Sequence, residues 1–274
     1  LSDAMVHFIE SVSAWTMAPL GAVVKMVLSQ PAAFDSPPQQ KVYHLVERQD
    51  GQKLTEARQR VLDYLGNPDQ LSKGDFASGI IAACGVSQKV LNGMETAGLL
   101  QIDLVSADRP PPVPLYDRNH LLLTDDQQNA ARRLCAAIGQ GFRVNLIDGV
   151  TGSGKTEVYF EAVEATIKAG QQVLILLPEI ALSAAWRARF TARFGVAPLE
   201  WHSDISSGQK RKSWRSVLQG SASVVVGARS ALFLPFSKLG LIIVDEEHEH
   251  AFKQEDQVIY QARDMAVLRG KLNQ

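Results

Sequence analysis

Residues 149–156, which read GVTGSGKT, fit the pattern G-x4-GK-[ST] of a phosphate-binding loop. The apolar run at residues 144–147 precedes the loop and a helical pattern follows it, which is the context that this motif requires. The glycines let backbone N–H groups turn towards a phosphate, and the N-terminus of the next helix adds its positive end. We expect Lys155 to reach the β- and γ-phosphates and the Thr156 hydroxyl to ligate Mg²⁺. The candidate nucleotide-binding residues of this loop are Gly149, Thr151, Gly152, Ser153, Gly154, Lys155 and Thr156.

A second motif, LIIVDEEH at residues 241–248, supplies the carboxylates that a P-loop site needs. Four apolar residues form a strand, and Asp245 follows at its tip, where it would hold Mg²⁺ directly or through water. Glu246 is then placed to orient or deprotonate the water that attacks the γ-phosphate. Lys155 and Glu246 are therefore the candidate catalytic residues of a nucleotide hydrolase that uses ATP and Mg²⁺.

Short apolar runs rich in β-branched residues recur between helical segments through the second half of the chain. They lie at residues 144–147, 173–177, 224–226 and 241–244. Such runs are typical of buried strands in a parallel sheet. The pattern predicts an α/β lobe over residues 121–274, with its ligands at the carboxyl ends of the strands.

Three smaller regions precede this lobe. Residues 1–53 contain two helical patterns broken at Pro19 and Gly21, and we expect them to be the helical tail of an upstream domain plus a linker. Residues 54–105 show helix, helix, glycine turn, helix and strand, an order typical of a small winged-helix domain. Residues 106–120 contain the polyproline stretch RPPPVP and predict a stiff linker.

The winged-helix segment has two interpretations. One places a helix carrying Ser87, Gln88, Lys89 and Asn92 against duplex or forked DNA. The other makes the segment a protein-docking module, because residues 56–103 hold four basic side chains against six acidic ones. Sequence-specific DNA readers are usually more basic than this.

Composition excludes several classes of protein. The 274 residues are 46% hydrophobic and 21% charged, which is typical of a globular chain rather than a disordered one. No apolar run approaches the roughly 18 residues of a membrane-spanning helix, and the first twenty residues do not resemble a secretory signal. The two cysteines are too few for a disulfide scaffold or a zinc site and favour a cytoplasmic location. Since the net charge is −1, nucleic acid would have to bind a local patch.

Such a patch is predicted between residues 187 and 229. Eight basic residues lie there and only Glu200 and Asp204 oppose them. They could form a track along a phosphate backbone, or a solvated helix face. Three tryptophans lie among them, Trp186, Trp201 and Trp214, and residues of this type are more often core than base-stacking platforms.

Several motifs together resemble one family. The strings GVTGSGKTEVY at 149–159, LPEIAL at 177–182, GARSALFLPF at 227–236 and LGLIIVDEEH at 239–248 stand in the order of the PriA family of replication-restart helicases, in superfamily 2. Residues 202–203 and 253–254, followed by Tyr260 and residues 262–264, also look like that family. Gln127, ahead of the P-loop, resembles the adenine-reading glutamine of superfamily 2.

This resemblance implies a RecA-like lobe of a DNA-dependent ATPase that unwinds with 3′→5′ polarity at stalled forks. Its partners would be single-stranded and forked DNA, the primosome and single-strand-binding proteins. His248 would couple nucleotide state to DNA. The implied DNA-binding residues are Pro178, Glu179, Arg229, Ser230, Phe252, Lys253, Tyr260 and Arg263. The sequence VIYQ at residues 258–261 departs from the Arg-Tyr-His type usual in the family.

Two parts of such a helicase are not found in this sequence. These are the second lobe, which would supply an arginine finger, and its cysteine-rich zinc insertion, so zinc is not expected here. We therefore expect the chain to bind nucleotide weakly, to hydrolyse it slowly at most and not to unwind DNA alone. Two alternatives remain open: a duplex translocase of the same superfamily, and a non-hydrolysing, ATP-switched DNA-binding or docking protein.

Overall fold

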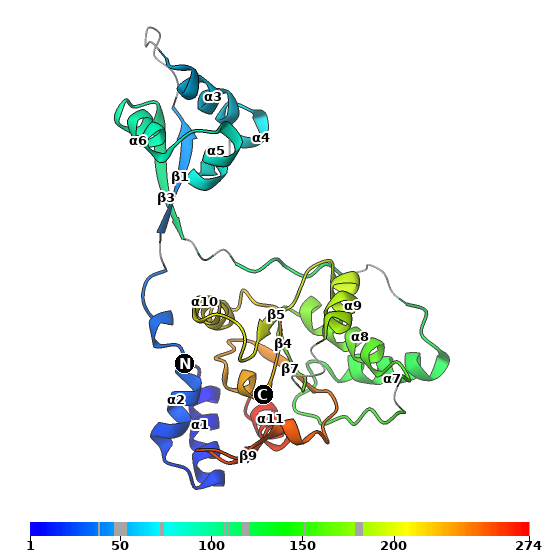
Figure 1. Cartoon of the computed structure of the whole chain (residues 1–274). Helices are drawn as coiled ribbons and strands as arrows, with labels where there is room; N and C mark the ends of the chain where they lie inside the picture. Colours follow the sequence, from blue (N-terminus) through cyan, green and yellow to red (C-terminus); the bar gives the residue numbers. More distant parts are fainter. Residues whose placement is uncertain are drawn as a thin grey trace. The chain divides into compact units, whose positions relative to one another are not determined.

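The computed structural model describes residues 1–37, 39–46, 54–71, 74–106, 108, 110–116, 121–150, 152–178 and 183–273. The chain forms two compact units (Figure 1). One unit combines Leu1–Asp35 with Pro110–Gln274, and the other is Ser36–Arg109. In the described part of the chain, no helix has the length and apolar character needed to cross a membrane.

The first unit is built on a parallel four-stranded sheet in the order β5-β6-β4-β7. Its strands are β4 (Gln172–Leu176), β5 (Leu199–Trp201), β6 (Val224–Gly227) and β7 (Leu239–Val244). The strand predictions at residues 173–177, 224–226 and 241–244 are confirmed to within a few residues. The mixed α/β lobe with a parallel sheet follows the sequence pattern.

The strand prediction at residues 144–147 is wrong. This segment forms no strand, and Val144 and Leu146 are 65% and 80% exposed. A strand is stabilised by pairing and by burial of its side chains, and here the backbone pairs with none of the four strands. Only Ile147 packs against the core, so three apolar residues around Asn145 were not sufficient.

One face of the sheet is covered by α8 (Lys155–Lys168) and α9 (Ala184–Phe194), with α7 (Asp125–Ala137) beside α8 (Figure 1). Alternate strand residues point to this face, as the two-residue period of a strand requires. The buried cluster here contains Val173, Ile175, Val224 and Val226 from the strands. It is completed by helix side chains that include Tyr159, Phe160, Trp186, Phe190 and Phe194.

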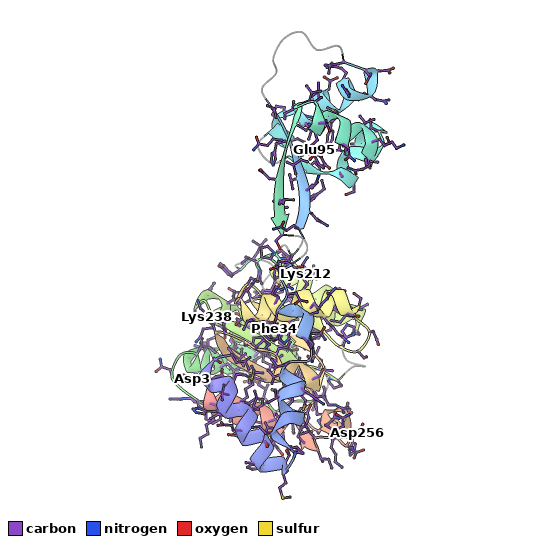
Figure 2. The ribbon with its side chains drawn as sticks, turned by 90° about the vertical axis from the view of Figure 1, so that its left-hand side faces the viewer. Asp3, Phe34, Glu95, Lys212, Lys238 and Asp256 are labelled. Atoms are coloured by element: carbon purple, nitrogen blue, oxygen red, sulfur yellow. The ribbon has the colours of Figure 1, made fainter. Side chains whose placement is uncertain are left out.

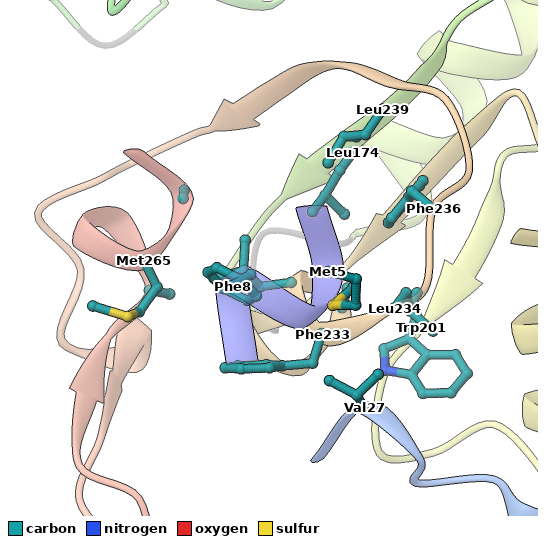
Figure 3. Close-up of a cluster of buried hydrophobic side chains, with 14 of the residues drawn as sticks. Met5, Phe8, Val27, Leu174, Trp201, Phe233, Leu234, Phe236, Leu239 and Met265 are labelled. Carbon is teal, nitrogen blue, oxygen red and sulfur yellow. The ribbon is translucent and has the colours of Figure 1, made fainter. Parts of the chain in front are cut away.

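The opposite face is covered by α1 (Asp3–Thr16), α2 (Leu20–Val27), α10 (Ser207–Leu218) and α11 (Ala262–Leu272) (Figure 1). Leu174 and Leu176 of β4 point to this side. Figure 3 shows Met5 and Phe8 of α1 in the same cluster as Phe233 of the 3-10 helix η3 (Arg229–Phe233). The sheet therefore lies between two helical layers.

The N-terminal helices are part of the lobe, which differs from the expected boundary after residue 53. Trp214 of α10 donates its indole N–H to the Val27 carbonyl at 2.9 Å, and Arg215 donates to the Ala33 carbonyl at 3.0 Å. The ring of Phe34 (Figure 2) lies edge-on to that of Trp214, with 5.1 Å between centroids. Helical spacing identified the two helices, but only the tertiary packing shows which core they fill.

A buried arginine joins these N-terminal helices to the C-terminal helix. Arg269 of α11 is 1% exposed and lies over the rings of Phe8 and Phe236, at 5.5 and 5.3 Å from the centroids. Its guanidinium donates to the Leu234 carbonyl at 2.6 Å. Burial lowers the pKa of Arg269 to about 9, because the charged form loses its hydration.

In its described residues, the second unit contains a three-stranded sheet in the order β2-β1-β3 and four helices. Its elements are β1 (Gln39–Leu45), α3 (Glu56–Leu65), α4 (Pro68–Leu71), β2 (Asp75–Phe76), α5 (Ala77–Cys84), α6 (Gln88–Thr96) and β3 (Leu100–Ser106). Ile80, Leu91 and Met94 lie in its core. The helices and the final strand stand in the predicted order, whereas the winged-helix identity stays a prediction.

The start of this unit differs from the expected residue 54. Strand β1 pairs antiparallel with β3 over seven residues, from Gln39 opposite Ser106 to Leu45 opposite Leu100. The sequence pattern places this segment in the N-terminal region, residues 1–53, because the pairing of a strand with a partner distant in sequence leaves no local signal.

The predicted linker at residues 106–120 is described in part. Residues 110–116 form neither helix nor strand, and the Leu115 N–H donates to the Phe194 carbonyl of the lobe at 2.8 Å.

Replacing Phe8 with Ala tests whether α1 is integral to the lobe. Phe8 is 0% exposed in the core, so we expect a loss of roughly 3–5 kcal/mol in the free energy of unfolding. Urea denaturation measures this change. The matched control is Trp15→Ala on the same helix, because Trp15 is 71% exposed and its loss should cost less than about 0.5 kcal/mol. Equal, small effects of both variants would contradict the integrated core.

Candidate nucleotide and nucleic-acid site

The P-loop is held by contacts within the loop and from α7. Gly152 and Gly154 have φ values of 80° and 84°, which favour glycine, and Gly154 caps α8. Lys155 Nζ donates to the Gly149 carbonyl at 2.7 Å. The lysine thus lies folded over the loop that is predicted to receive phosphate. Thr151 lies outside the described residues.

Gln127 contacts the P-loop directly. Its side-chain amide donates to the Ser153 carbonyl at 2.8 Å, while its carbonyl accepts from the Thr124 N–H at 2.9 Å. The Thr124 hydroxyl accepts in turn from the Gln127 N–H, which completes a capping box at the start of α7. The sequence did not predict the contact of Gln127 with Ser153, although Thr124 and Gln127 show the spacing of a capping box. Adenine recognition by Gln127 stays a prediction.

Asp245 and Glu246 lie at the carboxyl end of β7, where their positions were predicted. The Asp245 N–H donates to the Leu176 carbonyl of β4 at 3.0 Å, and its Oδ1 accepts from the Glu246 N–H at 3.0 Å. Glu246 has a φ of 51°, an uncommon value for a side chain of this kind. His248 Nε2 lies 3.7 Å from Glu246 Oε2, and both side chains are well exposed.

The phenol of Tyr159 connects the P-loop helix to Asp245. Its O–H donates to Asp245 Oδ2 at 3.0 Å, and it accepts from the Trp186 indole N–H at 3.0 Å. The Thr156 hydroxyl lies near the same oxygen. Burial and the nearby Asp245 raise the pKa of Tyr159, so the phenol keeps its proton. The structure therefore brings together residues of both nucleotide motifs.

The donor set fits Mg²⁺ completed by a nucleotide. Thr156 and Asp245 offer hard oxygen ligands, which Mg²⁺ prefers, and phosphates and water usually supply the others. Within the described residues, no three His, Cys, Asp or Glu side chains form a protein-only metal site. The loop is tight at Gly149, where an added Cβ would meet Ser153 Oγ at 2.7 Å.

A groove of about 590 Å³ opens along the same carboxyl edge of the sheet. Residues that follow β4, β5 and β6 line the groove, together with Met26 near the end of α2. Its polar lining includes His202, Ser203, Lys210, Arg229, Ser230 and Gln30, with Pro178 beside them. None of the described residues that line it is Asp or Glu. Four of the implied DNA-binding residues, Pro178, Arg229, Ser230 and Phe252, thus line one cationic groove.

The implied DNA contacts differ in their exposure. Phe252 and Tyr260 are 0% and 5% exposed, and Tyr260 packs against Phe233, so the rings of these two implied DNA-binding residues belong to the core. Lys253 pairs with Glu255, and Arg263 pairs with Glu247 and Asp264 at the surface. Glu179 lies outside the described residues.

Several basic residues of the predicted track form ion pairs or hydrogen bonds within the lobe. Arg193 is buried and pairs with Glu164 at 2.6 Å and Glu161 at 3.0 Å, and Arg189 pairs with Glu157 at 2.7 Å. Arg229 donates to the carbonyls of Ala251 and Lys253. Trp186, Trp201 and Trp214 are core residues, as their residue type favoured. The sequence could not show this because the acidic partners lie outside the basic stretch.

The comparisons with known proteins agree with this geometry. The family model described as "Type III restriction enzyme, res subunit" matches residues 120–269. Proteins named "Replication restart protein PriA" match from Rickettsia felis, at 42% identity over 63% of this chain and 26% of the relative, and from Haemophilus influenzae, at 40% over 81% and 30%. The protein of that name from Chlamydia pneumoniae is 35% identical over 95% of this chain and 36% of its own length. The chain thus spans about a quarter to a third of these relatives.

Replacing Gly149 with Ala tests the P-loop geometry. The backbone of Gly149 is not in the left-handed region, so the substitution acts through the clash with Ser153 Oγ. Such overpacking costs roughly 1–3 kcal/mol, and we expect nucleotide affinity to fall about 5-fold to 150-fold. Fluorescence anisotropy of a labelled nucleotide measures the change.

A second substitution supplies the control for this variant. The double variant Gly149→Ala, Ser153→Ala removes the clashing hydroxyl, and the next Ser153 atom lies at an ordinary 3.5 Å from the added Cβ. We expect it to recover most of the lost affinity. If the double variant binds as weakly as the single one, the described loop conformation is not the one that binds nucleotide.

Proposed function

The chain belongs to the family of the type III restriction enzyme res subunit and is a homologue of the PriA replication restart proteins, and from this we propose that it is a motor lobe of an ATP-dependent DNA helicase. The helicase would act with 3′→5′ polarity at stalled forks, in the cytoplasm, and support primosome assembly. One observation carries the proposal: the P-loop helix and Asp245 meet at the edge of the sheet that also forms a cationic groove.

At the nucleotide site, each residue has a separate task. Lys155, which is close to the Gly149 carbonyl, exchanges this bond for the β- and γ-phosphates. Thr156 and Asp245 hold Mg²⁺, which neutralises charge on the phosphate oxygens when bound. Glu246 orients the attacking water and takes its proton. An arginine from a second lobe would complete the site, so this chain alone should hydrolyse ATP slowly.

At the groove, Lys210, Arg229 and Ser230 would contact the phosphates of a single strand. Positive charge with polar donors is the feature that phosphate backbones require. The lack of acidic residues among its described lining supports this use. His248 lies in sequence between Glu246 and Ala251, which lines the groove, and would couple the nucleotide state to DNA binding.

The Ser36–Arg109 unit would act as the winged-helix domain. Two roles remain for it, contact with duplex or forked DNA and docking to a protein of the primosome or to a single-strand-binding protein. Lys89 and Asn92 lie on α6, the helix that would meet DNA. Binding of forked DNA that weakens on Lys89→Glu would favour the first role.

Replacing Lys155 with Ala tests the nucleotide site of this chain. Charge-assisted hydrogen bonds are worth about 1.5–3 kcal/mol, so we expect Mg·ATP affinity to fall roughly 10-fold to 150-fold. Isothermal titration calorimetry measures it, and Lys238→Ala, a lysine on the turn before β7, is the control. Unchanged binding in Lys155→Ala would contradict the assigned phosphate site.

Replacing Glu246 with Gln separates a motor from an ATP-switched protein. In a protein that also contains the second lobe, we expect ATP hydrolysis stimulated by forked DNA to fall roughly 10²- to 10⁴-fold, because the general base is lost. Binding of Mg·ATP should be retained. Strand displacement on 3′- and 5′-tailed duplexes tests polarity in the same preparation. Translocation on duplex without displacement would support the alternative of a duplex translocase.

A further inference from the structure

The buried phenol of Tyr159 occupies an unusual position between the two nucleotide motifs. Tyr159 lies one turn after Thr156 on α8, so both side chains share a helix face. Asp245 comes from β7 and Trp186 from α9, and both reach the same phenol oxygen. One atom thus contacts two elements besides its own helix.

Counting donors and acceptors fixes the direction of each bond. A phenol has one hydrogen to donate and two lone pairs to accept. The Trp186 indole N–H can only donate, so it occupies one lone pair, at 3.0 Å. The Asp245 carboxylate can only accept, so it takes the phenolic hydrogen, also at 3.0 Å. The remaining lone pair can accept the hydrogen of the nearby Thr156 hydroxyl.

A Thr156 hydroxyl that donates to this lone pair keeps its own lone pairs for a metal. Asp245 Oδ1 is held by the Glu246 N–H at 3.0 Å while Oδ2 is held by Tyr159, so the carboxylate has little freedom to rotate. The Asp245 carboxylate is therefore oriented before any nucleotide arrives.

We propose that Tyr159 is a positioning residue, which orients the Thr156 hydroxyl and the Asp245 carboxylate for Mg²⁺, and that Trp186 fixes the direction of its phenolic bond. This rests on the proposed function, because it assumes that both residues hold the metal of a bound nucleotide. Partners of metal ligands commonly contribute roughly 10-fold to 100-fold in metal affinity.

The test replaces Tyr159 with Phe, which removes only the hydroxyl. The affinity for a fluorescent ADP analogue is measured in excess Mg²⁺ and in EDTA. The Mg²⁺ midpoint, which is the Mg²⁺ concentration that gives half of the Mg²⁺-dependent increase in binding, is then measured at a fixed nucleotide concentration. We expect the midpoint to rise roughly 10-fold to 100-fold, while affinity in EDTA changes less than about 2-fold. Trp186→Phe should shift the midpoint in the same direction by a smaller factor.

Two controls separate positioning from loss of packing. Trp214→Phe removes a buried indole hydrogen bond on the other face of the sheet, to Val27, and should leave the Mg²⁺ midpoint unchanged. Asp245→Asn removes the proposed ligand and should abolish the Mg²⁺-dependent gain in affinity.

The outcomes are distinguishable. If Asp245→Asn keeps the Mg²⁺-dependent gain, the proposed metal site itself fails. If Asp245→Asn loses this gain but Tyr159→Phe keeps the wild-type midpoint, positioning by Tyr159 is overturned and the proposed function stands. If Tyr159→Phe weakens binding equally in Mg²⁺ and in EDTA, the hydroxyl supports the P-loop in general and the inference is again overturned.

Discussion

Parallel pairing of four strands, with both faces of the sheet buried, is the constraint on which the lobe depends. Because parallel strands end at one edge, β4, β5, β6 and β7 deliver their following residues to the same side. Asp245 follows β7, Pro178 follows β4, His202 follows β5 and Arg229 follows β6. Asp245 and the cationic groove are neighbours for this reason.

Burying both faces requires two helical layers, and the chain takes them from distant segments. On one side, α8 and α9 follow the P-loop and pack with strand residues such as Ile175. On the other side, α1 and α2 come from the extreme N-terminal part and join α10 and α11. Arg269 is buried between Phe8 and Phe236 in this layer. The Ser36–Arg109 unit thus interrupts a lobe whose core is formed on both sides of it in sequence.

The nucleotide site is organised by side chains that ordinary motif reading passes over. Gln127 donates to the Ser153 carbonyl of the P-loop, and Tyr159 of the P-loop helix donates to Asp245. Neither contact needs a nucleotide to form. Such prior orientation reduces the reorganisation that would otherwise accompany binding. Both contacts come from α7 and α8, which pack beside the loop. The helical layer that covers this face of the sheet therefore also positions residues of the nucleotide site.

The sequence by itself determined what depends on short-range pattern. The P-loop, the strand ending in Asp245, the two helical patterns before residue 28 and the alternation of strands with helices all follow from residues within a few positions of one another. Tertiary structure alone decided the rest. It placed α1 in the lobe core, paired β1 with β3, buried Phe252 and Tyr260, and set Arg193 against Glu164. It also left residues 144–147 unpaired, because a strand needs a partner that its own sequence does not contain.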